Sequence, residues 1–252
     1  MSFSHGLKDM SLNLSYYGKS DVGLKRRNNE DAYVVEPDLG FCAVADGMGG
    51  AAAGEIASHI FTKAAQDVFA EPGPYSVERR MDLMQKTFGL ANQRILDHIK
   101  TNPQHAGMGC TAELLAFSET NFVLGHMGDS RTYRLRNHQL KQITQDHSLV
   151  QDQIAQGLIT PDEARRHPLR HVILRAVGTS DTPSLDLIRG KLCADDIFLL
   201  CSDGLTDMVD DEKIKHTLDT GNDLEKVTDE LIEIAKSFGG KDNITVVLCK
   251  FI

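Results

Sequence analysis

The segment from residue 121 to residue 144 constrains the fold more than any other part of the chain. It reads NFVLGHMGDSRTYRLRNHQLKQIT, in which short strand-like runs follow one another with only turn residues between them. Parallel strands need a crossover of a dozen or more residues, whereas antiparallel strands can be joined by a tight turn. The segment therefore predicts antiparallel sheet. Helices packed outside such a sheet give an α+β layering, which we favour over a doubly wound parallel sheet.

Apolar patterns elsewhere predict further strands and three long helices. The strand-like runs include DAYVVE, FCAVAD, TAELLAF, DIFLLCSD and NITVVLCKF. Residues 54–69, 77–100 and 224–238 repeat apolar side chains at helical spacing, and we interpret these stripes only as core faces. No linker, repeat or low-complexity segment interrupts the chain. We therefore expect a flexible N-terminal tail over 1–14 and a single domain over 15–252.

Composition limits the function classes. The net charge of −9 argues against sequence-independent nucleic-acid binding. No run approaches 18 apolar residues, and the N-terminus lacks a cationic segment followed by an apolar one, so we expect a cytoplasmic protein without a membrane span. The five cysteines are scattered and form no C-x-x-C pair, which predicts reduced thiols rather than disulfides or zinc ligands. Three of them, Cys42, Cys201 and Cys249, lie in apolar runs and are expected to be buried.

Acidic residues recur where the apolar runs begin or end. A single aspartate before a glycine usually marks only a turn. If the sheets bring several such ends together, however, the carboxylates share a small volume and repel one another unless a cation neutralises them. The acids that end a run are Asp46, Asp129 and Asp203, and those that open one are Glu30, Asp31 and Asp242.

The ligand types indicate which cation such a cluster would hold. Carboxylates and backbone carbonyls are hard oxygen donors, which suit Mg²⁺ or Mn²⁺ and not structural zinc. No histidine or cysteine lies at metal-ligand spacing, and the calcium loop of an EF-hand is absent. Arg26 lies four residues before Glu30, where a guanidinium could hold phosphate oxygens in a fork. The basic run 25–27 equally suits a solvated surface, so spacing alone leaves both interpretations open.

The stretch VADGMGGAAAGEIAS also admits a nucleotide-binding interpretation. Residues 47–52 fit G-x-G-x-x-A, the turn that cradles the pyrophosphate of a dinucleotide. Asp46 would repel that pyrophosphate. The acid that should end a second strand about 20 residues further on is missing, because Asp67 and Glu71 lie on or just after the same predicted helix. We keep dinucleotide binding as the less favoured alternative.

Seven segments in one order carry a family resemblance. They are SDVGLKRRNNEDAYVV, VADGMGGAAAGEIAS, GCTAELLAF, HMGDSRTYRL, DHSLVQDQIAQGLITPDEARRHPLRHVILRAVG, LLCSDGLTDMV and GGKDNITVVL, and they span residues 20–250. Together they resemble the bacterial members of the metal-dependent (type 2C, PPM family) protein serine/threonine phosphatases. The resemblance implies a four-layer α-β-β-α sandwich, in which two antiparallel sheets are flanked by helices and the metals lie in a cleft at one end.

The resemblance also implies an activity and a set of roles. The activity is metal-dependent hydrolysis of phosphoserine and phosphothreonine in proteins by a metal-bridging hydroxide, which reverses a Ser/Thr kinase. Two Mg²⁺ or Mn²⁺ ions are implied, with a third, weaker one allowed. Asp46 would bridge two ions, Gly47 would give its carbonyl to one of them, and Arg26 would bind the phosphate. The other ligands would be Asp203 and Asp242 for the second ion, Glu30 and Asp31 through water, and Asp129, Asp203 and Asp207 for the third.

One position departs from the animal members of this family. They carry a histidine after Asp-Gly that is proposed as general acid, whereas this chain has Met48, which cannot donate a proton. A metal-bound water is our first candidate for the acid. His147 is a second candidate, although a role beside a turn or helix cap suits it better.

Residues 146–177 resemble the flap beside the active site in bacterial members. The segment is basic within an acidic chain, so it could attract phosphorylated protein segments, or it could be an ordinary amphipathic helix and loop. Its basic residues are Arg165, Arg166, His167, Arg170, His171 and Arg175.

The resemblance implies phosphorylated proteins as partners, together with a cognate Ser/Thr kinase. We expect a monomer that binds neither nucleic acid nor membrane. Two alternatives stay open: a catalytically weak phosphoprotein-binding regulator, or pseudophosphatase, and a partner-switching regulator. Retention of every acidic ligand weighs against the first, and Arg26 with the flap weighs against the second.

Overall fold

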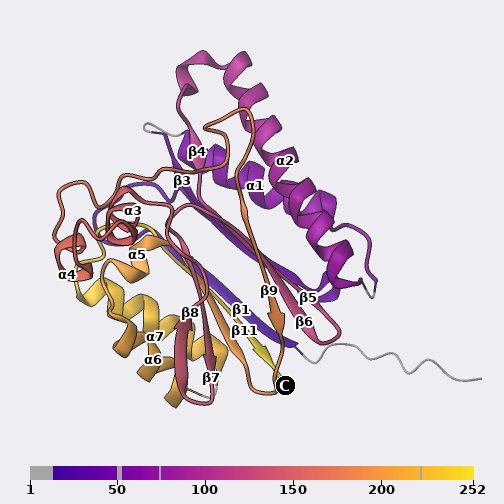
Figure 1. Ribbon diagram of the computed structural model, residues 1–252, viewed down its shortest axis with the longest axis vertical. Helices are drawn as coiled ribbons and strands as arrows, with labels where there is room; N and C mark the ends of the chain where they lie inside the picture. Colours follow the sequence, from indigo (N-terminus) through magenta and orange to yellow (C-terminus); the bar gives the residue numbers. More distant parts are fainter. Residues whose placement is uncertain (1–13, 50–52, 74, 222) are drawn as a thin grey trace, which may run out of the picture.

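The computed structural model describes residues 14–49, 53–73, 75–221 and 223–252, and its strands form two antiparallel sheets (Figure 1). The first sheet has the order β1-β11-β10-β7-β8 and the second the order β2-β3-β5-β6-β9, with β4 paired to β3. The strands of the first sheet are β1 (Leu14–Asp21), β7 (Arg131–Arg136), β8 (Gln139–Gln142), β10 (Ile197–Cys201) and β11 (Ile244–Phe251). Those of the second are β2 (Asp31–Glu36), β3 (Phe41–Met48), β4 (Gly109–Cys110), β5 (Ala112–Ser118), β6 (Asn121–Met127) and β9 (Asp186–Lys191).

Helices cover the outer face of each sheet. Figure 1 shows α1 and α2 on one side of the molecule and α6 and α7 on the other. The apolar stripes of these helices are buried against the sheets, and a third apolar cluster fills the space between the two sheets. The α-β-β-α sandwich is therefore confirmed. The helices are α1 (Gly54–Val68), α2 (Val77–Thr101), α3 (Leu149–Ala155), α4 (Pro161–Ala164), α5 (Asp203–Thr206), α6 (Asp211–Thr220) and α7 (Leu224–Ser237), with short 3-10 helices at Pro37–Leu39 and Pro103–His105.

The segment 121–144 folds as predicted, with one addition. It forms β6, β7 and β8, and a tight turn at Asn137 and His138, both with positive φ, joins the last two. β6 and β7, however, belong to different sheets. The turn between them therefore carries the chain from one sheet to the other and places Asp129 at the junction.

Two parts of the chain bear on the remaining fold predictions: the N-terminal segment and two edge strands. The expected tail over 1–14 lies outside the described residues except for Leu14, which is the first residue of β1. β1 and β9 were not predicted. Both are edge strands with only partly buried side chains, so neither shows the apolar run of a central strand.

The cysteines are free, as predicted. Cys42, Cys201 and Cys249 are completely buried, and the Sγ atoms of Cys42 and Cys249 lie 3.2 Å apart between the sheets. Within the described ranges, no helix combines the length and the apolar character needed to cross a membrane.

Candidate metal centre

The predicted acids come together at one end of the two sheets. Asp31 and Asp46 are opposite one another in the register of β2 and β3. In the other sheet, Asp203 follows β10 and Asp242 precedes β11, and these two strands are neighbours. Asp129 lies in the turn that joins the sheets. Antiparallel pairing thus brings acids that are far apart in the sequence into one cluster.

The carboxyls of this cluster act on one another electrostatically. The pKa of Asp46 is raised well above its usual range, first by burial and then by the charges of Asp31, Asp203, Asp129 and Asp242. Some of the surface of Asp46 still reaches solvent. The neighbouring charges therefore matter as well as burial, and neutralisation needs either protons or a cation.

The other members are perturbed in the same direction. Burial, followed by the charges of Asp129 and Asp207, raises the pKa of Asp203 well above its usual range. Burial raises the pKa of Asp31 to about 6 and that of Asp129 to about 7. Such a group of mutually repelling buried carboxyls is the environment expected of an acidic metal site.

Polar neighbours hold Asp31 in place on one side only. Ser202 and Thr245 donate hydrogen bonds to its Oδ2 atom at 2.8 and 2.6 Å. Its Oδ1 atom is buried and has no hydrogen-bond partner among the described residues, and the same holds for Oδ1 of Asp203. Buried polar atoms are nearly always paired. The two orphaned oxygens therefore fit a hard cation, which the donor set of carboxylates also suits.

Glycines allow the backbone to approach closely beside Glu30. The amide of Gly47 donates to the carbonyl of Glu30 at 3.1 Å. A Cβ atom at Gly47 would lie 2.1 Å from the carbonyl oxygen of Gly54, and one at Gly54 would lie 2.7 Å from Oε2 of Glu30. The end of β3, the start of α1 and the Glu30 side chain are thus in contact, and larger residues would separate them.

Asn243 joins the loop of Arg26 to the loop of Asp242. Its side-chain oxygen accepts from the amide of Glu30 at 2.8 Å, and its amide group donates to the carbonyls of Val22 and Asn28. Nη2 of Arg26 pairs with Oδ2 of Asp242 at 2.7 Å. The structure therefore places Arg26 beside the cluster. Sequence reasoning missed Asn243, although its position directly after Asp242 was a signal.

A histidine also reaches the cluster. Ligand atoms of His171, Asp203 and Asp207 lie within 4.8 Å of one another. Sequence reasoning counted His171 only among the basic residues of 146–177 and found no histidine at metal-ligand spacing. Asp203 lies 32 positions after His171, so the fold and not a local spacing brings these ligand atoms together.

His147 is engaged within the protein and Met48 ends β3. Nδ1 of His147 accepts from the amide of Gly128 at 3.2 Å, and Nε2 lies 3.3 Å from Oδ2 of Asp186. His147 is buried, and both of its ring nitrogens have partners, which supports the structural role over that of general acid. Met48 pairs with Gly109 of β4 and is only partly buried.

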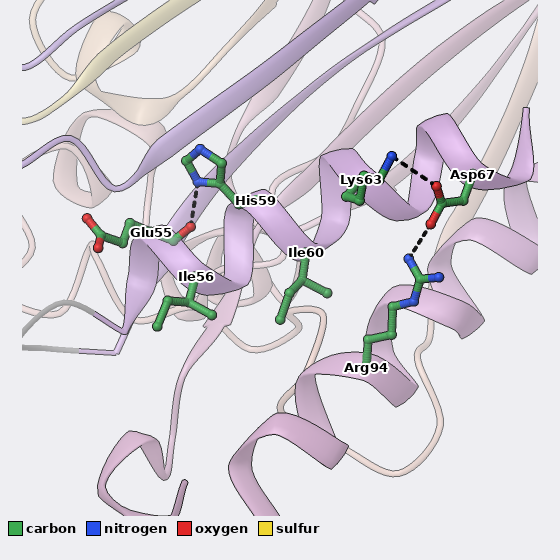
Figure 2. A pocket seen from close by; sticks show the side chains of 7 residues that line it. All are labelled: Glu55, Ile56, His59, Ile60, Lys63, Asp67 and Arg94. Carbon is green, nitrogen blue, oxygen red and sulfur yellow. Dashed lines mark hydrogen bonds and ion pairs between the residues drawn. The ribbon is translucent and has the colours of Figure 1, made fainter. Parts of the chain in front are cut away.

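A groove on the surface lies away from the acidic cluster. It has a volume of about 660 Å³ and runs along α1 over Ile56 and Ile60. Figure 2 shows Asp67 between Lys63 and Arg94 at one end of it, with distances of 3.2 and 2.7 Å. None of the predicted site residues lines this groove. The acidic cluster, and not the groove, therefore carries the candidate chemistry.

Comparison with known proteins settles the family. The sequence profile described as protein phosphatase 2C matches residues 25–248. The chain belongs to the protein phosphatase 2C family. Its antiparallel β2, β3 and β5 also show that the dinucleotide-binding alternative is wrong, because that fold needs parallel strands. Residues 50–52 of the G-x-G-x-x-A pattern lie outside the described residues.

Relatives of this protein phosphatase 2C chain are bacterial. It is 38% identical over 244 residues to serine/threonine protein phosphatase PstP of Mycobacterium tuberculosis, covering 96% of this chain and 46% of PstP. It therefore spans about half the length of that relative. It is 34% identical over 234 residues to serine/threonine phosphatase stp of Listeria monocytogenes, covering 91% of this chain and 93% of stp.

A solved structure supports the fold and bears on the metals. The catalytic domain of PstP in complex with two manganese ions has a TM-score of 0.85 and 37% identity, covering 94% of this chain and 97% of that one. The protein phosphatase 2C architecture predicted from the sequence is thus confirmed, and a relative of this chain holds two Mn²⁺ ions.

Proposed function

We propose that this protein hydrolyses phosphoserine and phosphothreonine in other proteins with the help of bound Mg²⁺ or Mn²⁺. The observation that carries the proposal is the meeting of strand-end carboxyls from both sheets, with buried oxygens of Asp31 and Asp203 left unpartnered. The names of the relatives and the two manganese ions of PstP support it.

We assign the ligand roles from this arrangement and from the family. Asp46 and the carbonyl of Gly47 would hold one ion, with Asp46 shared with a second. Glu30 and Asp31 would act through water. Asp203 and Asp242 would hold the second ion, and Asp129, Asp203 and Asp207 a third, weaker one.

The chemistry divides between the cations and the chain. Two divalent cations, when bound, lower the pKa of water and neutralise charge on a phosphoryl group. Arg26 would bind two phosphate oxygens. Only its Nη2 atom pairs with Asp242, and both side chains are partly exposed, so a change in this pairing costs little. Met48 has no proton to donate and both ring nitrogens of His147 are engaged within the protein, so we assign the proton of the leaving oxygen to water.

We extend the proposal to partners and setting. The substrates would be proteins phosphorylated by a cognate Ser/Thr kinase, and the protein would act in signal transduction as a cytoplasmic monomer. Free buried thiols suit a reducing compartment. Residues 146–177 would form a flap whose basic residues attract phosphorylated segments, since His171 already reaches the cluster.

The test is hydrolysis of p-nitrophenyl phosphate and of a phosphothreonine peptide with Mn²⁺, with and without EDTA. Activity should require Mn²⁺ and be lost in Asp46→Asn, while the matched control Asp38→Asn, an exposed aspartate outside the cluster, stays active. A wild-type protein that binds the peptide without hydrolysing it would favour the pseudophosphatase. An Asp46→Asn variant at full activity would refute the metal assignment.

A further inference from the structure

Exposed apolar side chains gather on a few segments of the chain. Nine large apolar residues are exposed in the described part of the chain, and three of them lie on the two loops that carry Arg26 and Asp242. Four more lie within 146–177. Large apolar side chains gathered in one region of a surface commonly mark a site of interaction. The three beside Arg26 and Asp242 are Val22, Leu24 and Phe238.

Backbone contacts place Leu24 against the turn that follows Phe238. The amide of Leu24 donates to the carbonyl of Gly240 at 2.8 Å. A Cβ atom at Gly240 would lie 3.0 Å from Cγ of Leu24, so the leucine side chain rests on this glycine, two residues from Phe238. Leu24 is 57% exposed and Phe238 63% exposed. The fold therefore places Leu24 beside the turn that follows Phe238, while most of the surface of both side chains stays in water.

The same two loops carry positive charge. Lys25, Arg27 and Lys241 are exposed, and none of them forms an ion pair with another residue that the structure describes. The chain as a whole has a net charge of −9. We call Leu24 and Phe238, with these three basic residues, the Leu24–Phe238 rim. Its chemistry complements a segment that is both anionic and apolar.

The position of the rim identifies its occupant. Arg26 lies on the same loop as Leu24 and pairs with Asp242, four residues after Phe238. A phosphorylated side chain bound at Arg26 brings the residues next to it in its own chain against the rim. The occupant is thus the substrate segment itself.

We propose that the Leu24–Phe238 rim binds apolar side chains flanking the phosphorylated residue, so that the protein selects phosphothreonine or phosphoserine segments with apolar neighbours. This inference rests on the proposed phosphatase function. Covering a side chain that is more than half exposed recovers about half of its full hydrophobic transfer energy, which corresponds to roughly fivefold in affinity for each residue.

The experiment compares two phosphothreonine peptides of equal charge with p-nitrophenyl phosphate. One peptide has leucine and phenylalanine beside the phosphothreonine, and the other has serine there. Wild-type kcat/KM should be at least about tenfold higher for the apolar peptide, mainly through KM. The Leu24→Ala/Phe238→Ala variant should reduce this preference to within about twofold. Its kcat/KM for p-nitrophenyl phosphate should stay near the wild-type value, because that substrate has no flanking residues, and this also reports correct folding.

Ile252→Ala is the matched control. Ile252 is also 57% exposed, but it follows the end of β11 that is opposite to Asp242. Figure 1 shows the C-terminus remote from α5, the helix that begins at Asp203. This variant should keep the peptide preference. Equal kcat/KM for both peptides in the wild type, or a preference that survives in the double variant, would refute the proposed role of the Leu24–Phe238 rim. Either result would leave the phosphatase function intact. A wild-type protein that hydrolyses no substrate with Mn²⁺ would overturn both.

Discussion

Replacing Glu113 with glutamine should strongly destabilise the protein, although Glu113 lies outside the acidic cluster. Glu113 of β5 accepts hydrogen bonds from Nδ1 of His126 in β6 and, at 2.5 Å, from Oγ1 of Thr132 in β7. Nε2 of His126 donates to the carbonyl of Gln145 at 2.9 Å. Both ring nitrogens therefore face oxygen atoms, an arrangement that favours an imidazolium paired with a carboxylate. The side chains of Glu113 and His126 are completely buried, and Thr132 links the pair to the other sheet.

The magnitude follows from burial and pairing. Burial alone would lower the pKa of His126, but the charge of Glu113 and its hydrogen bond outweigh it and raise the pKa to about 9. Removing one partner of a buried pair costs about 3 to 5 kcal/mol, because the other charge is left uncompensated. We expect Glu113→Gln to lose that much free energy of unfolding at pH 7. A Glu113→Gln/His126→Gln double variant should lose less, since no buried charge remains.

The pair also predicts a pH dependence with a definite sign. Below an unfolded pKa of 6.5, His126 is protonated in both states and its pairing contributes in full. As the pH rises from 6.5 to 9, the unfolded chain loses this proton first, so stability falls. The 2.5-unit difference corresponds to about 3 kcal/mol, lost by about pH 9. Burial also raises the pKa of Glu113, so its titration makes stability fall with rising pH as well, starting from the ordinary value of 4.5.

Urea unfolding at pH 6, 7.5 and 9.5 measures both effects. The difference in unfolding free energy between wild type and the double variant should shrink by about 3 kcal/mol across this range. Comparison with the double variant cancels the titration of other groups. A Glu113→Gln variant within about 1 kcal/mol of wild type, or a difference that does not change with pH, would refute the charged pair.

Three further predictions concern the loops and the cluster. Arg26→Ala should raise KM for a phosphopeptide about tenfold with a smaller change in kcat, measured by steady-state kinetics; an unchanged KM would remove Arg26 from the phosphate site. Gly204→Ala should destabilise the protein by about 1 to 3 kcal/mol, because its Cβ would lie 1.9 Å from the carbonyl of Asn243. The control Gly89→Ala, in α2 with open space around it, should instead gain about 0.5 to 1 kcal/mol in the same urea unfolding assay, and the opposite order would contradict the packing argument. Saturating Mn²⁺ at 100 times its Kd should raise the unfolding free energy of wild type by about 2.7 kcal/mol for each ion bound and that of Asp203→Asn by clearly less; equal shifts in a thermal scan would argue against Asp203 as a ligand.

The fold was predictable where apolar runs in the sequence are joined by connections too short to allow more than one arrangement of the strands. The short connections of 121–144 required antiparallel pairing, and strand-final acids such as Asp46 pointed to one end of the sheets. β1 and β9 escaped prediction because edge strands keep solvent-facing polar residues and show no apolar run. Their places depend on which strand each one pairs with, which no local pattern encodes.

The site was predictable only in part, for a related reason. Carboxylates at strand ends are visible in the sequence, but the residues that support them are ordinary polar residues. Ser202 and Thr245 were missed because their roles exist only through contact with Asp31 across more than 170 positions. His171 was missed because the chain must fold back before it meets Asp203 and Asp207. Positioning groups of this kind become recognisable only in three dimensions.

The central claim is that carboxyls from both sheets form one dinuclear metal centre. Electron paramagnetic resonance of the Mn²⁺-loaded protein, with bound manganese counted after removal of free metal, tests it most directly. Two ions about 4 Å apart that share Asp46 should give the multiline signal of a magnetically coupled pair, with at least two Mn²⁺ per chain. Asp46→Asn should abolish this coupled signal. Uncoupled six-line Mn²⁺ in the wild type, or fewer than two bound ions per chain, would contradict the account.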